Sequence, residues 1–225
     1  MSMLDSENRN SESGNRLSQR IFPVIIPLYV LFFILFSGIL TSSTAFWALM
    51  SGGIFTITMM CFLFDARQLV LLQLDIRSDT FRKILVGVGM ALILYGIFYI
   101  GGVLSRQVFP QSSFLIDSIY DLRRDSSPVV LFLILIFVIG PGEELSWRAY
   151  VQRHLGSQLK PRYALLISIF LYTFAHIPSG NPMLILAAFV CGLIWGLMYH
   201  FFGSVLINIV SHACWDVMVF VLFPL

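Results

Sequence analysis

Long apolar stretches constrain this chain more than any other feature of its sequence. Seven stretches carry few or no charges, and most approach the roughly 20 residues that a helix needs to cross about 30 Å of hydrocarbon. The chain is 58% hydrophobic and only 12% charged, too little polar surface for a soluble globule. The sequence therefore predicts an all-α, polytopic transmembrane helix bundle of about seven spans, near residues 21–40, 44–64, 84–104, 128–147, 163–178, 183–200 and 203–224.

A tight turn separates the fifth and sixth stretches. Residues 178–182 read Pro-Ser-Gly-Asn-Pro, a cluster that ends helices because proline fixes its own φ and lacks an N–H donor. We therefore expect these two stretches to form a helical hairpin.

The positive charges predict how the chain lies in the cell membrane. Cytoplasmic loops are enriched in Lys and Arg. With the amino terminus in the cytoplasm and the carboxyl terminus outside, eleven of the 14 Lys and Arg residues fall on the cytoplasmic side. These are Arg9, Arg16, Arg20, Arg67, Arg77, Arg82, Lys83, Arg148, Arg153, Lys160 and Arg162.

Three regions follow from this pattern. Residues 1–20 form a polar cytoplasmic tail, and residues 21–127 form an accessory region with three spans. The connectors 65–83 and 105–127 mix apolar and charged residues, which is typical of segments that lie on the membrane surface. Residues 128–225 hold the last four spans and nearly all the polar residues inside spans, so we expect any chemistry there.

The sequence gives no support for nucleic-acid binding, disulfide bonds or a cysteine metal site. The formal charge of +2 and the absence of a basic and aromatic pattern argue against nucleic acid. Cys61, Cys191 and Cys214 lie inside apolar runs at unrelated spacings, which indicates packing rather than disulfides or a metal cage.

Two adjacent carboxylates end the fourth apolar run. A charged side chain at membrane depth is costly and marks a functional site by default. On a helix Glu144 and Arg148 are four residues apart and can pair, while Glu143 points about 100° away, where it is free to face a cavity. We expect residues 140–142, Gly-Pro-Gly, to loosen or kink the helix there.

Two further polar clusters follow. His176 ends the fifth stretch, four residues after Tyr172, and alone it is more typical of an anchored side chain than of a catalyst. Asn208, His212 and Asp216 are spaced by four and form one stripe along the last helix, a pattern that interhelical hydrogen bonding could also explain. On the predicted topology Glu143 and His212 lie in the cytoplasmic half, and His176 lies closer to the outer face.

These clusters leave three chemistries open: acid/base hydrolysis, metal-assisted hydrolysis and proton-coupled transport. The chain has neither His-Glu-x-x-His nor Gly-x-Ser-x-Gly, so neither of these hydrolase motifs is present.

Taken together, Glu143-Glu144-x-x-x-Arg148, Tyr172-x-x-x-His176 and His212-x-x-x-Asp216 resemble the three motifs of the CAAX-protease and bacteriocin-processing (CPBP) family. The resemblance covers residues 128–220 and makes 128–225 a protease core. Two positions depart from the family pattern, which has Phe at the position of Tyr172 and Asn or a similar residue at that of Asp216.

The resemblance implies an intramembrane endopeptidase that cleaves a membrane-associated or lipidated peptide, such as a CAAX-like tail, a leader peptide or a sorting signal. It implies a glutamate-type mechanism that requires no cofactor. The catalytic residues are Glu143, His176, His212 and Asp216, and the supporting residues are Glu144, Arg148, Asn208 and Tyr172.

Two alternatives stay open. In a zinc-dependent version of the same protease, the metal ligands would be Glu143, His176 and His212. The other is a non-catalytic membrane protein, either a bacteriocin-immunity or scaffold factor or a proton-coupled transporter. A transporter would more often show broken helices in both halves of the chain, and the polar breaks here occur only in the second half.

Overall fold

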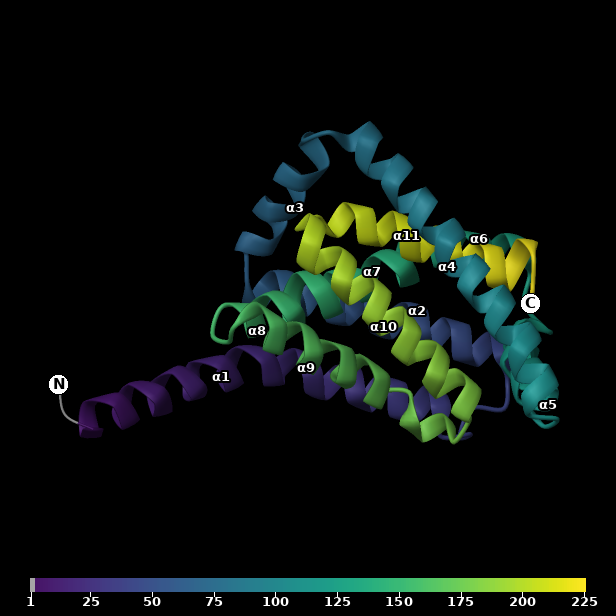
Figure 1. Cartoon of the computed structure of the whole chain (residues 1–225), viewed down its shortest axis with the longest axis horizontal. Coiled ribbons are helices and arrows are strands. Elements are labelled where there is room, and N and C mark those ends of the chain that lie inside the picture. Colours follow the sequence, from purple (N-terminus) through teal and green to yellow (C-terminus); the bar gives the residue numbers. More distant parts are fainter. Residues whose placement is uncertain (1–2) are drawn as a thin grey trace.

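A computed structural model describes residues 3–225, with side chains from residue 19 onward, and this part of the chain contains helices and no strands. The all-α prediction is confirmed (Figure 1). The α-helices in chain order are α1 (Met3–Phe36), α2 (Ser43–Phe64), α3 (Arg67–Arg77), α4 (Thr80–Val108), α5 (Ser112–Tyr120), α6 (Pro128–Ile134), α7 (Gly140–Ser146), α8 (Arg153–Gly156), α9 (Pro161–Phe174), α10 (Pro182–Phe202) and α11 (Val205–Val217).

Six helical stretches in the described part of the chain are long and apolar enough to cross a membrane. They are Gln19–Phe36, Ser43–Phe64, Thr80–Val108, Pro128–Gly156, Pro182–Phe202 and Val205–Leu222. Large apolar side chains such as Phe55, Phe81 and Phe137 are exposed on their outer faces, where a bilayer covers them. The protein is a multi-pass membrane protein.

The fifth expected span, 163–178, differs from its prediction. It forms α9, which has 14 residues and ends before the 3₁₀ turn Ile177–Ser179 and the left-handed Gly180 (φ 59°). Fourteen residues measure roughly 21 Å along a helix axis, less than the roughly 30 Å of a hydrocarbon core. In the described residues, six stretches are thus long enough to span the membrane, and the shorter α9 pairs with α10 in the expected hairpin.

The connections lie at two opposite ends of the bundle. Each end is held by side-chain hydrogen bonds between connectors and helix ends. At one end Trp47 Nε1 donates to Leu122 O (2.6 Å) and Asn181 Nδ2 donates to Leu115 O (2.8 Å). At the other end Arg153 Nη2 donates to Asp65 Oδ2 (2.7 Å) and Leu206 N donates to Asp75 Oδ2 (2.9 Å).

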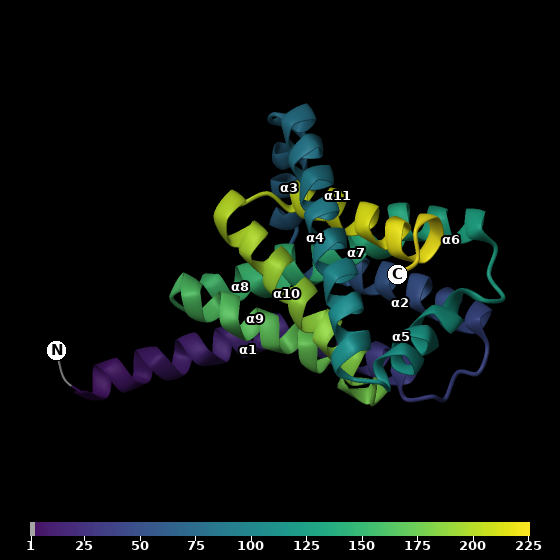
Figure 2. The same ribbon diagram turned by 45° about the vertical axis from the view of Figure 1, so that its right-hand side comes forward.

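Helices also form in both long connectors, α3 at one end and α5 at the other. Figure 1 shows the amino-terminal helix and the carboxyl terminus on opposite sides of the bundle, and Figure 2 shows the bundle from a second direction. The charge count assigned successive connectors to opposite sides of the membrane, and termini on opposite sides of the bundle agree with that assignment. Which end faces the cytoplasm stays a prediction from the positive charges.

Two glycines allow neighbouring helices to approach α7. A Cβ on Gly142 would overlap Cγ2 of the fully buried Ile54 on α2, and one on Gly140 would lie 3.0 Å from the backbone of Ala213 on α11. The π-helical segment Leu135–Ile139 directly precedes α7, which widens the helix where we expected it to loosen. The Gly-Pro-Gly stretch is itself α-helical and provides close packing, and the irregular backbone lies directly before it rather than within it.

We expect Gly142→Ala to lower the free energy of unfolding by about 1–3 kcal/mol, because the added methyl overpacks a closed contact. Unfolding of the purified protein in mixed detergent micelles would measure it. Gly156→Ala is the matched control, since a Cβ there meets only Ala164 Cβ at 3.9 Å.

Because Ile54→Ala removes the clashing methyl, the Gly142→Ala/Ile54→Ala double variant should lose less than the sum of the two single losses. Additive losses would show that Gly142 does not serve this contact.

Candidate active site

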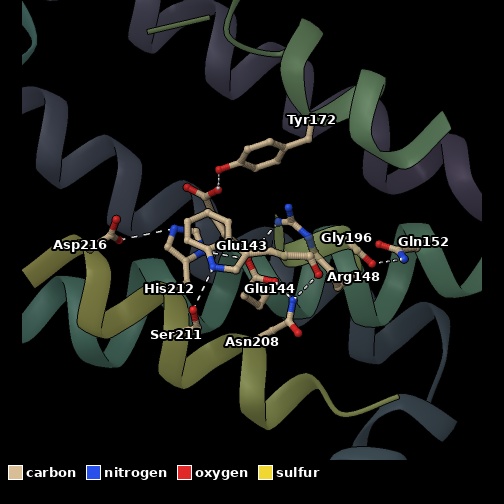
Figure 3. A network of polar contacts seen from close by, with 11 residues as sticks. Glu143, Glu144, Arg148, Gln152, Tyr172, Gly196, Asn208, Ser211, His212 and Asp216 are labelled. Carbon is tan, nitrogen blue, oxygen red and sulfur yellow. Dashed lines mark hydrogen bonds and ion pairs between the residues drawn. The ribbon is translucent and has the colours of Figure 1, made fainter. Parts of the chain in front are cut away.

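The polar residues of the last four helices meet where α7 packs between α2 and α11 (Figure 3). The π-helical segments Leu135–Ile139 and Trp147–Gln152 flank α7 on both sides. Such segments often mark functional sites in helices. Glu143 and Glu144 are adjacent on α7, so their side chains leave the helix in different directions and have different partners.

Glu144 is fully buried and is the shared acceptor of three side chains. Arg148 Nη1 lies 2.9 Å from Oε1, His212 Nδ1 lies 2.8 Å from the same oxygen, and Asn208 Nδ2 donates to Oε2 at 3.0 Å. The expected Glu144–Arg148 ion pair is present. The two other bonds join α7 to α11, a role for Glu144 that the spacing of four residues did not predict.

Arg148 lies between aromatic rings as well as beside a carboxylate. Its guanidinium carbon is 4.6 Å from the centre of the Tyr172 ring and 5.5 Å from that of Trp195. Cation–π contacts of this kind stabilise a charge that has left water. The arginine therefore links α7 with α9 and α10 while its charge is balanced by Glu144.

His212 has a carboxylate near each ring nitrogen. Nδ1 contacts Glu144, and Nε2 lies 3.5 Å from Oδ2 of Asp216. The ring also stacks on Trp195, with centroids 3.7 Å apart and planes inclined by 20°. Since carboxylates only accept hydrogen bonds, this arrangement favours a proton on both nitrogens and fixes the plane of the ring.

Glu143 has a different environment from its neighbour. Its one hydrogen bond to a side chain comes from the Tyr172 hydroxyl, which donates to Oε2 at 3.0 Å. Among the described side chains, no Lys, Arg or His nitrogen lies within ion-pair distance of Glu143. Its second oxygen, Oε1, is therefore free to bind a small molecule such as water.

His176 ends α9 and faces the same space. Its Nδ1 lies 2.9 Å from Tyr172 O, so Nδ1 carries the proton and Nε2 is left as an acceptor in the neutral ring. Phe32 and Phe36 of α1 pack around the ring, at centroid distances of 5.0 and 5.3 Å. These contacts orient the imidazole without using Nε2.

One cavity of about 110 Å³, the Glu143 cavity, brings most of the predicted residues together. Its wall combines aromatic and aliphatic side chains with five polar ones: Glu143, Tyr172, His176, His212 and Asp216. The different depths expected for Glu143 and His176 do not separate them, because the short α9 ends level with the cavity. Glu144, Arg148 and Asn208 lie behind this wall and do not line the cavity.

Trp195 is the residue of the cluster that sequence reasoning missed. The Trp195 ring stacks on His212, its carbonyl accepts from Asn208 (2.7 Å), and its Nε1 donates to Ser211 Oγ (3.2 Å). Its neighbours Gly192 and Gly196 let α10 approach α9, as small residues do in membranes. A tryptophan in an apolar span gives no signal of such a role.

The alternative metal ligands Glu143, His176 and His212 line the same cavity. Within the described part of the chain, however, no group of three or more His, Cys, Asp and Glu side chains is arranged to hold a metal ion. The Nδ1 atoms of both histidines face protein acceptors, which leaves Nε2 of each ring as the atom that would bind a metal. The zinc-dependent version of the protease therefore stays an alternative.

Residues 125–218 match the sequence model of a family described as Type II CAAX prenyl endopeptidase Rce1-like. This match confirms the resemblance seen in the three motifs, and it spans every polar residue of the cluster. The matched segment is thus similar to a CAAX-type intramembrane endopeptidase. Neither a curated protein nor a solved structure matches the chain.

We expect Arg148→Ala to reduce the yield of folded protein, because it removes the cation that balances a fully buried carboxylate. Orphaning a buried charge costs about 3–5 kcal/mol. Monodispersity in size-exclusion chromatography and thermal unfolding would measure the effect. Arg124→Ala, which breaks an exposed pair with Asp121, is the control and should change little. A normal yield of inactive Arg148→Ala protein would instead assign Arg148 to the reaction.

Proposed function

We propose that this protein is a glutamate-type intramembrane endopeptidase in which Glu143 activates the attacking water. The observation that carries the proposal is the environment of Glu143. Its carboxylate is buried, has one oxygen free, and shares a cavity of about 110 Å³ with two histidines. A water molecule needs only about 10–15 Å³ of such space and a few polar partners, so the cavity has room for water and a peptide group.

In the first step Glu143 accepts a proton from this water as general base. The Tyr172 hydroxyl occupies Oε2, so the proton goes to Oε1. Nε2 of His176 is the natural second contact of the same water, because Nδ1 of this ring is already bonded to the backbone. The water oxygen then forms a bond to the carbonyl carbon of the substrate.

The carbonyl oxygen gains negative charge in this step, and His212 is the donor available to it. Nδ1 is held by Glu144 and the ring by Trp195, so Nε2 is fixed in direction before substrate binds. Preorganised donors of this kind stabilise oxyanions effectively. Asp216 keeps the proton on Nε2, and this N–H can be shared between Asp216 and the oxyanion.

In the last step protonated Glu143 gives its proton to the amide nitrogen, and the carbon–nitrogen bond breaks. One water is consumed, and a carboxylate and an amine are released. Glu144, Arg148 and Asn208 take no part in proton transfer and hold α7 and α11 in register.

The substrate we propose is a membrane-associated or lipidated peptide, such as a CAAX-like tail, a leader peptide or a sorting signal. A buried active site inside a multi-pass protein requires a substrate that can leave water. We place the protein in the cell membrane with its amino terminus in the cytoplasm, on the basis of the positive charges.

We expect Glu143→Gln to abolish cleavage while the protein still folds, because the amide keeps the shape of the side chain and loses its basicity. General bases contribute about 10²- to 10⁴-fold to rates. New amino termini in reconstituted membrane proteins, identified by terminal labelling and mass spectrometry, measure the activity. Asp121→Asn is the control, since that carboxylate is exposed. Unchanged cleavage by Glu143→Gln protein contradicts the assignment of the base.

We expect chelators such as 1,10-phenanthroline to leave the cleavage rate unchanged, because the proposed steps use only side chains and water. The same terminal-labelling assay, with and without chelator, would test this. Loss of activity that zinc restores would replace the proposal with the zinc-dependent version.

A further inference from the structure

A second and larger cavity lies directly beside the Glu143 cavity. It measures about 210 Å³, and α4, α5, α10 and the end of α11 enclose it; we call it the α4–α10 cavity. Its lining is almost entirely apolar. Five residues line both cavities and form the wall between them: Ile119, Leu184, Ala187, Trp215 and Phe220.

The outer rim of the α4–α10 cavity lies between two helices that face lipid. Ile97 of α4 and Leu186 of α10 both line the cavity and are 39% and 51% exposed. Figures 1 and 2 show that the end of α4 and the start of α10 both lie near α5. An apolar chain in the bilayer can therefore reach the cavity from the side without passing through water.

Two glycines of α4 line the cavity, Gly101 exposed and Gly102 half-buried. Gly101 and Gly102 follow Phe98 by three and four residues, so they extend the helix face that lines the cavity. A Cβ at either position would meet no atom within 4 Å. Unlike Gly140 and Gly142, these glycines do not serve helix packing, and the space beside them is empty of protein atoms.

Trp215 provides a second, independent observation in the dividing wall. Its ring packs edge-on against Phe98, with centroids 4.8 Å apart. Its Nε1 is buried and has no hydrogen-bond partner. A buried donor without a partner is unfavourable and uncommon, and a carbonyl group of a bound peptide is the simplest acceptor for it in these apolar surroundings.

We propose that the α4–α10 cavity is the substrate subsite for the apolar residues next to the cleaved bond, and that this segment enters from the bilayer between α4 and α10. The proposal rests on the proposed endopeptidase function. An extended peptide advances about 3.3 Å per residue, so residues close to the scissile bond must occupy the space beside the Glu143 cavity. Helices α4 and α5 lie outside the matched segment 125–218, so the accessory region contributes one side of this subsite and α10 and α11 contribute the other.

Gly102→Leu tests the proposal, because the added Cβ meets no atom within 4 Å and the rest of the new side chain takes up space beside the cavity lining. Gly96→Leu is the matched control: it adds the same side chain to the same helix, also meets no atom within 4 Å, and does not line the cavity. Both variants are made in Glu143→Gln protein, which would bind substrate without cleaving it. The probe is a short leucine- and alanine-rich peptide with one photoreactive leucine, incorporated in phosphatidylcholine vesicles.

We expect cross-links on α4, α10 and Trp215 in the Glu143→Gln protein, mapped by mass spectrometry. Filling the cavity should reduce labelling about tenfold or more in Gly102→Leu, whereas Gly96→Leu should stay within about twofold. Gly102→Ala fills less space and should give an intermediate loss. Equal labelling of the Gly102→Leu and Gly96→Leu variants, or cross-links confined to other helices, would overturn the subsite.

Cleavage of the same peptide by protein that retains Glu143 separates the subsite from the proposed function. Cavity labelling together with cleavage supports both. Labelling as expected without any cleavage would support the cavity as a peptide-binding site and overturn the protease assignment. Cleavage that is equally fast in Gly102→Leu and Gly96→Leu proteins would overturn the subsite alone.

Discussion

The fully buried carboxylate of Glu144 is the group on which the rest of this site depends. A carboxylate without water must receive hydrogen bonds from the protein, and here it receives them from Arg148, Asn208 and His212. These donors come from two different helices, so satisfying one charge also fixes how α11 is rotated against α7. The orientation of the His212 ring then follows, and with it the direction of its second nitrogen.

The same arrangement explains how two neighbouring glutamates acquire different tasks. Glu144 is saturated with donors, including a permanent cation, and has no capacity left for chemistry. Glu143 has one neutral donor, Tyr172, and an open cavity. In the proposed reaction Glu144 supplies rigidity and Glu143 supplies basicity. The distinction depends on partners and not on depth, because both side chains are buried.

Local sequence patterns predicted the features of the fold and the site that lie within single helices. The features that were not predicted depend on contacts between residues far apart in the sequence. The Glu144–Arg148 pair follows from a spacing of four residues on one helix, and six of the seven predicted spans are long and apolar enough to cross a membrane. The contact of His212 with Glu144 joins residues 68 apart and requires the rotation of both helices. Similarly, 163–178 is apolar along most of its length, and only the turn after Phe174 shortens it. The stacking of Trp195 on His212 has no sequence signature.

Helices α1 and α2 contact the site although both lie outside the matched segment. Sequence similarity begins at residue 125. Yet Phe32 and Phe36 form the packing of His176, and Ile54 closes against Gly142. The segment that carries the motifs is therefore not an autonomous domain, and it could not be moved as a cassette between membrane proteins. The sequence match begins at residue 125, but the side chains that pack around the site also come from α1 and α2, which carry none of the motifs.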